Sequence, residues 1–343
     1  MNDDLRLMKE TVRDFSIKNI ENTSLKIERE GIDRNLIKKL SEQGFLGATA
    51  PQKYGGSELD ILSYCAILEE LSSFSPSVGV LVYLYNSIGA KAFENTSLAE
   101  EYLPKILSGE ITLGFGYGDI LEGFEAESRT GDGSLLKRDV IFPGADKFMV
   151  IDGQGEDVIF ASGTIRESKN KKSLGMRGLG ISDVKLDMAQ SRKVCKKSEL
   201  EKALGNSSLE IASILLGIIK GALDKAIEYA KVRTTFDHYL KDYSPIAFSL
   251  SLLKSEEEML RSYIYESDAN PRKGLNALLF SEALSKRATK QALQTHGGYG
   301  YLEDFGVEKF YRDAMAVSTI LFRGKKDRKR LSDEVFGVNS GFL

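Results

Sequence analysis

The stretch from residue 216 to residue 236 constrains this fold more than any other part of the chain. Its sequence, LGIIKGALDKAIEYAKVRTTF, places apolar residues every three or four positions. That period predicts one long amphipathic helix, ending in an Arg-x-x-Phe at Arg233 and Phe236. Gly217 and Gly221 are four residues apart and therefore share a face, although each costs about 1 kcal/mol of helix propensity relative to Ala. We expect another backbone to approach the helix closely at this face.

Three kinds of sequence follow one another along the chain. Short amphipathic helical patterns fill residues 1–110, and a Gly-rich, strand-like texture fills residues 111–198. Longer helical patterns with short connections fill residues 199–343 and predict a bundle of four helices. We therefore predict a mainly α fold with an amino-terminal helical domain, a small central β domain and a carboxy-terminal four-helix bundle. The four bundle helices are expected at Leu209–Arg233, Ile246–Ser267, Gly274–His296 and Phe310–Phe322.

Composition excludes several classes of function. The net charge of the 343 residues is −3, so nothing suggests a nucleic-acid or anionic-membrane partner. The two cysteines, Cys65 and Cys195, cannot form a disulfide framework and have no metal-ligand spacing, which favours a reducing cytoplasm and no metal site. The first residues lack the apolar core of a signal peptide, and no apolar run reaches the length of a membrane span.

Several segments, taken in order, resemble the acyl-CoA dehydrogenase family. The resemblance covers nearly the whole chain and is carried by Leu40–Ala90, Tyr102–Glu110 (YLPKILSGE), Ser173–Asp187 (SLGMRGLGISDVKLD), Ala222–Phe236 and Gln294–Ala314 (QTHGGYGYLEDFGVEKFYRDA). It implies FAD as cofactor, an acyl-CoA substrate and a dimer of dimers, with electron-transfer flavoprotein as a possible partner. It also implies that a carboxylate removes the proton α to the thioester, while hydride passes from the β carbon to the flavin.

The resemblance also implies the residues that would hold the cofactor. In the family, the Arg-x-x-Phe and a Gln-x-x-Gly-Gly corner reach across a dimer to the neighbour's FAD. Here these positions are Arg233, Phe236, Gln294, Gly297 and Gly298. A planar guanidinium suits phosphate oxygens, and glycines allow the backbone to come close to a ligand. The simpler alternative for the arginine is a cation that favours the helix dipole.

Two family motifs are missing. The flavin-binding Thr-Glu-Pro-x-x-Gly-Ser-Asp is replaced by Phe115–Ser128, and the strand that usually covers the flavin is replaced by Val140–Val150. The usual base, the Glu of Tyr-Glu-Gly-Thr, is replaced by Arg323 or, when the segment is aligned on Arg312, by Leu321. Neither is a carboxylate, and an arginine stays protonated and cannot accept a proton.

The candidate base is therefore elsewhere. The alternative family position for the base, at the start of the long bundle helix, maps to Ser207 or Ser208. Glu210, close by, is the candidate catalytic carboxylate, although it could equally be an acid that complements the helix N-terminus. Two functions follow. The chain is an acyl-CoA dehydrogenase-like flavoprotein with a relocated base, or a catalytically deficient subunit that completes the flavin site of a homologous partner.

Overall fold

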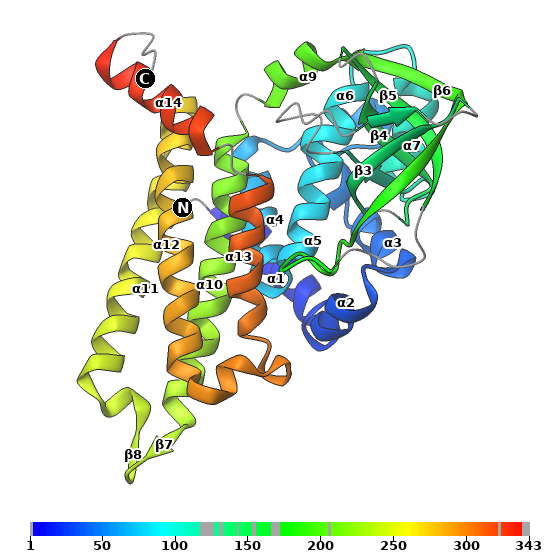
Figure 1. Cartoon of the computed structure of the whole chain (residues 1–343). Helices are drawn as coiled ribbons and strands as arrows, with labels where there is room; N and C mark the ends of the chain where they lie inside the picture. The colour runs from blue at the N-terminus through cyan, green and yellow to red at the C-terminus, as the bar shows by residue number, and fades with distance from the viewer. Residues whose placement is uncertain are drawn as a thin grey trace.

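The computed structural model describes residues 3–116, 127–129, 133–142, 144–152, 156–165, 172–204, 207–321 and 324–337. Helices dominate, and a small sheet lies to one side of a set of long helices (Figure 1). The predicted fold class is confirmed. The predicted residues Phe322 and Arg323, and much of the segment that replaces the flavin motif, lie outside the described residues.

The amino-terminal section consists of short helices. Asp33 and Asp60 begin two of them, because each carboxylate accepts hydrogen bonds from backbone N–H groups of the first turn. Every residue of α5 and of the π-helix η4 that follows it is buried, as the apolar pattern in this part of the sequence predicts. The helices are α1 (Asp3–Asn19), α2 (Ser24–Glu30), α3 (Arg34–Glu42), α4 (Ile61–Phe74), α5 (Pro76–Tyr83), η4 (Leu84–Ala90), α6 (Lys91–Phe93) and α7 (Ala99–Leu107).

The sheet closes on itself. Its order is β1-β4-β5-β6-β3-β2, and β1 also pairs with β3 through Phe115 and Ile141. Only the β1–β4 pairing is parallel among the pairs described. Alternate apolar side chains fill its interior as a separate small core. The strands are β1 (Leu113–Phe115), β2 (Glu127–Arg129), β3 (Leu135–Ile141), β4 (Lys147–Ile151), β5 (Asp157–Ile165) and β6 (Ile181–Lys196).

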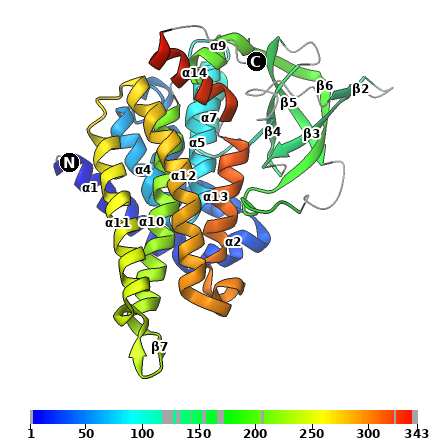
Figure 2. The ribbon, with the colours of Figure 1, turned by 60° about the vertical axis from the view of Figure 1, so that its left-hand side comes forward.

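The four predicted bundle helices are present and run side by side (Figures 1 and 2). They are α10 (Ser208–Val232), α11 (Ser244–Tyr265), α12 (Pro271–His296) and α13 (Glu308–Ile320), with α9 (Lys197–Leu204) before them and α14 (Gly324–Phe336) after them. The predicted continuation of α10 to Phe236 is wrong. The helix ends at Val232, and the strands β7 (Thr234–Thr235) and β8 (His238–Tyr239) form a hairpin whose turn gives Phe236 a positive φ of 45°.

The predicted close approach at the two glycines of α10 is confirmed. A Cβ on Gly217 would lie 2.2 Å from the carbonyl oxygen of Glu69, and one on Gly221 would lie 2.3 Å from that of Ser73. Both carbonyls belong to α4. Any larger residue at these positions would therefore force α4 and α10 to shift locally.

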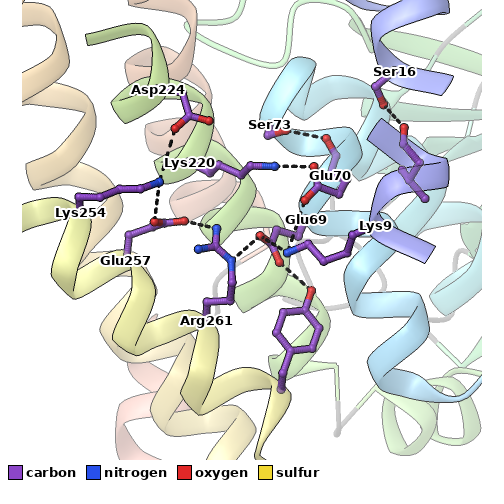
Figure 3. A network of polar contacts seen from close by, with 12 residues as sticks. Lys9, Ser16, Glu69, Glu70, Ser73, Lys220, Asp224, Lys254, Glu257 and Arg261 are labelled. Carbon is purple, nitrogen blue, oxygen red and sulfur yellow. Dashed lines mark hydrogen bonds and ion pairs between the residues drawn. The ribbon is translucent and has the colours of Figure 1, made fainter. Parts of the chain in front are cut away.

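A network of charged side chains around the buried Glu69 joins the same helices (Figure 3). The Glu69 carboxylate has no exposed surface and accepts from Lys9 Nζ at 2.7 Å, from Arg261 Nε at 3.0 Å and from the Tyr265 hydroxyl at 2.6 Å. Burial raises the pKa of Glu69, but the two cations and these hydrogen bonds outweigh it and lower that pKa to about 2. The network ties α1, α4 and α11 together around α10.

Candidate active site

Glu210 lies in the first turn of α10, at the wall of a cavity of about 220 Å3. Apart from Glu210, the cavity is bounded by three hydroxyl groups, one ammonium group and three aliphatic side chains. These are Thr49, Ser87 and Ser207, then Lys91, then Leu59, Ile61 and Leu204. The lining therefore comes from the loops around α3 and α4, from η4 and α6, and from the junction of α9 with α10.

The Glu210 carboxylate differs from an ordinary acid at a helix N-terminus in its hydrogen bonding and in its pKa. Its Oε2 atom is buried and has no hydrogen-bond partner among the described residues. Burial raises the pKa of Glu210 to about 7, against the opposing effects of the Ser87 hydroxyl and the Lys91 ammonium. A carboxylate that only complemented a helix N-terminus would have its pKa lowered, because the dipole favours the anion. The raised pKa favours the catalytic interpretation, since a base works best with a pKa near the working pH.

The walls facing Glu210 are held in place by Asn86. The side chain of Asn86 is fully buried and donates to the carbonyl oxygens of Phe45 at 2.8 Å and Val82 at 2.9 Å. Its carbonyl oxygen accepts from the backbone N–H of Thr49 at 3.0 Å. These bonds fix the loop after α3 against the π-helix that carries Ser87, and π-helical turns are frequent at functional sites.

The serines that the resemblance offered as alternative base positions are both buried. Ser207 donates to the carbonyl oxygen of Leu204 at 2.8 Å, and the Ser208 hydroxyl has no hydrogen-bond partner in the described part of the chain. Neither side chain can accept a proton at neutral pH. Glu210 is therefore the carboxylic acid among the residues that line this cavity, and its neighbours Ser87 and Lys91 carry no sequence motif that would have identified them.

The predicted cofactor corner forms at the other end of α10. The Arg233 guanidinium lies over the ring of Tyr299, 5.5 Å from its centroid, and forms no ion pair with any described residue. Tyr229 stacks on His296 at 4.3 Å, which brings α10 against the start of the Gly-Gly turn. Gly297 has a φ of 58°, a conformation that favours glycine.

The rest of the corner is open. Gln294, Gly297 and Gly298 are exposed, and a Cβ on either glycine would meet no atom within 4 Å. Phe236 lies at the hairpin turn with 89% of its surface exposed. At 1.5 Å per residue, the corner lies about 35 Å along α10 from Glu210. One chain therefore cannot bring the two predicted sites to a single small ligand.

A third region lies at Ile141, in the Val140–Val150 segment that replaces the family's flavin-covering strand. Ile141 packs with side chains of α5 and α13 around a gap of about 10 Å3, lined by apolar residues alone. A gap of this volume could hold at most about one water molecule. A flat ring could enter only if these side chains separated.

The described residues contain no group of three His, Cys, Asp or Glu side chains placed to hold a metal ion. They also contain no helix that is both long enough and apolar enough to cross a membrane.

The chain is similar to known proteins over most of its length. The family model "Acyl-CoA dehydrogenase, N-terminal domain" matches residues 2–110, and "Acyl-CoA dehydrogenase, C-terminal domain" matches residues 199–327. An acyl-CoA dehydrogenase of Bacillus subtilis is 27% identical over 95% of both chains. A subunit of a caffeyl-CoA reductase–Etf complex of Acetobacterium woodii is 25% identical over 90% of this chain and 92% of its own length.

Solved structures agree on the fold. Butyryl-CoA dehydrogenase of Megasphaera elsdenii superimposes with a TM-score of 0.80 at 22% identity, covering 98% of this chain and 99% of that one. A glutaryl-CoA dehydrogenase of Mycobacterium smegmatis in complex with FADH2 gives a TM-score of 0.85 at 17% identity, covering 100% and 97%.

Proposed function

Because this chain belongs to the acyl-CoA dehydrogenase family, we propose that it transfers hydrogen between the α and β carbons of an acyl-CoA thioester and FAD. Relatives named as dehydrogenases and as reductases are both similar to it, so the proposal covers either direction. The alternative, a subunit without activity of its own, is not favoured by these matches.

One observation carries the catalytic part of the proposal: the unpartnered, buried Oε2 of Glu210 at the wall of the 220 Å3 cavity. In the oxidative direction this oxygen accepts the α proton, and in the reductive direction it returns the proton. The pKa of about 7 lets the group hold or release that proton at neutral pH. The aliphatic side chains of Leu59, Ile61 and Leu204 exclude water from one side of the acyl group.

The corner residues fit a phosphate-bearing cofactor. Arg233 offers an unpaired guanidinium, and the open space beside Gly297 and Gly298 lets a ligand approach their backbone N–H groups. When bound, FAD supplies the hydride chemistry. In this proposal Arg233, Phe236, Gln294, Gly297 and Gly298 hold the FAD of a facing protomer, because the corner is about 35 Å along α10 from the Glu210 of its own chain.

A facing protomer implies an oligomer, as in the predicted dimer of dimers. Helix α11 lies away from the sheet in Figures 1 and 2, and it exposes Phe248 at 72%, Leu252 at 60% and Met259 at 60%. A large exposed apolar surface on a helix is typical of a protein contact.

We further propose domain boundaries near residues 110 and 198, and electron-transfer flavoprotein as the redox partner. We also propose a cytoplasmic location, because Cys65 and Cys195 are both free cysteines.

The test is anaerobic mixing of the purified full chain, loaded with FAD, with butyryl-CoA and other short acyl-CoA thioesters. Loss of the visible flavin absorbance is the expected result, and Glu210→Gln should slow it by about 100-fold or more. Exposed Glu258→Gln is the matched control and should react as the unmodified chain does. A chain that never bleaches with any acyl-CoA would refute the reaction. Equal rates for the unmodified chain and Glu210→Gln would refute only the choice of base.

A further inference from the structure

A second, larger cavity lies where the amino-terminal helices meet the bundle. Its volume is about 470 Å3, within the range usual for small-molecule sites. Residues of α1, α2, the carboxyl end of α4, α10 and the segment leading into α13 surround it. It shares no lining residue with the Glu210 cavity or with the corner at Arg233.

Lys309, a lining residue of this cavity, is a buried lysine with spare hydrogen-bonding capacity. It is only 2% exposed, and its Nζ donates to the carbonyl oxygen of Phe74 at 3.3 Å. The ammonium also lies 4.6 Å from the ring centroid of Phe310. Asp313 and Glu28 attract it from a distance, but it forms no ion pair with a carboxylate of the described chain. An ammonium group has three donors, so two N–H groups lack a protein acceptor.

Two further cations lie at the outer part of the cavity. The exposed Lys225 donates from Nζ to the carbonyl oxygen of Phe305 at 3.3 Å, and Arg13 lies over the ring of Phe74 at 5.7 Å. Burial lowers the pKa of Lys309, and repulsion from Lys225 lowers it further. A bound anion would relieve both effects.

Four carboxylates also line this cavity, and two of them are paired with lysines that lie outside the lining. Asp224 is paired with Lys254 at 3.4 Å, and Glu228 is paired with Lys231 at 2.6 Å. The other lining acids, Glu21 and Asp304, are exposed residues whose charge is screened by water. The most deeply buried charged side chain of the lining is thus the cation Lys309. The rings of Phe74, Phe305 and Phe310 also line the cavity.

We propose that this cavity binds a small organic anion, a carboxylate or phosphate group carried on an aromatic or short apolar body. The anionic group accepts hydrogen bonds from Lys309 Nζ, with Lys225 nearer the mouth, and charge-assisted bonds of this kind are among the strong ones. The apolar body contacts Phe74, Phe305 and Phe310. The ligand would contact the amino-terminal helices and the bundle together.

The experiment is isothermal titration calorimetry of the full chain with benzoate, inorganic phosphate and benzamide, the last as a neutral analogue of benzoate. Benzoate should bind and benzamide should bind at least about tenfold more weakly, because only the anion pairs with the ammonium. Lys309→Met should weaken benzoate binding by about 10- to 100-fold. Lys290→Met, which removes an exposed lysine of α12, is the control and should leave affinity unchanged. Phosphate binding with the same dependence on Lys309 would assign the site to phosphates as well as carboxylates.

Three results would overturn the proposal. These are no benzoate binding to the unmodified chain, equal benzoate affinity in Lys309→Met, and loss of benzoate binding in Arg233→Ala, which would put the anion at the corner. Should Lys309→Met fail to fold, NMR of 13C-labelled lysine in the unmodified chain replaces it. Benzoate is then expected to raise the pKa of one buried lysine, and an unchanged lysine spectrum would count against the site.

Discussion

Replacing Glu210 by Gln should stabilise the protein above pH 7 while removing the proposed base. The folded chain holds the pKa of Glu210 at about 7, whereas its ordinary value is 4.5. Since one pKa unit corresponds to 1.36 kcal/mol, ionising this buried carboxylate costs about 3 kcal/mol at high pH. Gln has nearly the same shape and no charge, so Glu210→Gln avoids that cost.

The sign of the effect depends on pH. Between pH 4.5 and 7 the folded chain binds this proton more strongly than the unfolded chain, so the free energy of unfolding falls as pH rises. Above pH 7 the ionisation of Glu210 lowers the free energy of unfolding little further. The gain for Glu210→Gln should therefore be about 3 kcal/mol at pH 8 and below about 1 kcal/mol at pH 5. Urea unfolding followed by circular dichroism at both pH values measures the difference between the two chains.

The pH dependence is what separates this reasoning from a packing effect. Glu258→Gln, at an exposed position of α11, should change the free energy of unfolding by less than about 0.5 kcal/mol at either pH. A gain for Glu210→Gln that is the same at pH 5 and pH 8, or no gain at pH 8, would refute the assignment of a buried, costly carboxylate.

Three other substitutions test the features around α10. Glu69→Gln should lower the free energy of unfolding at pH 7 by about 1–3 kcal/mol, because Lys9 and Arg261 each lose one of two carboxylate partners, and the deficit should shrink between pH 4.5 and 2 as Glu69 itself becomes protonated in the unmodified chain. Gly217→Ala should cost about 1–3 kcal/mol by urea unfolding despite the gain in helix propensity, because its Cβ meets a carbonyl of α4. Arg233→Ala should cost less than about 1 kcal/mol of stability yet lower the FAD content of the purified protein, measured by absorbance.

The sequence predicts the parts of this fold that depend on local pattern. Helical period locates the four bundle helices within a few residues, and the pair Gly217 and Gly221 predicts a close helix contact without saying which helix makes it. The helical pattern predicts an end of α10 at Phe236, four residues beyond the observed end, because the hairpin at Phe236 depends on the paired strands β7 and β8 and two-residue strands leave no periodic signal.

Pairings between distant residues could not be predicted. Glu69 and Arg261 are far apart in the sequence, and a glutamate near a helix end is ordinarily exposed. For the same reason the sequence alone cannot distinguish a catalytic role for Glu210 from that of an acid that complements the helix N-terminus. Its proximity to Ser87 and Lys91, and the absence of a partner for its Oε2, arise from the packing of α10 against η4 and are invisible in a helical pattern.

The length of α10 sets how a complete site can be assembled. Glu210 and Arg233 bound a single helix that is held rigidly against α4 at Gly217, so the distance between them cannot shorten without breaking that contact. If both residues serve one dinucleotide-dependent reaction, they must do so on different cofactors, and each complete site then takes its proton acceptor and its phosphate contact from two chains. At a fixed concentration of free FAD, dilution below the dissociation constant of the dimer should therefore lower the fraction of chains that bind FAD before it unfolds the chain, whereas the occupancy of a monomeric site would not change with protein concentration.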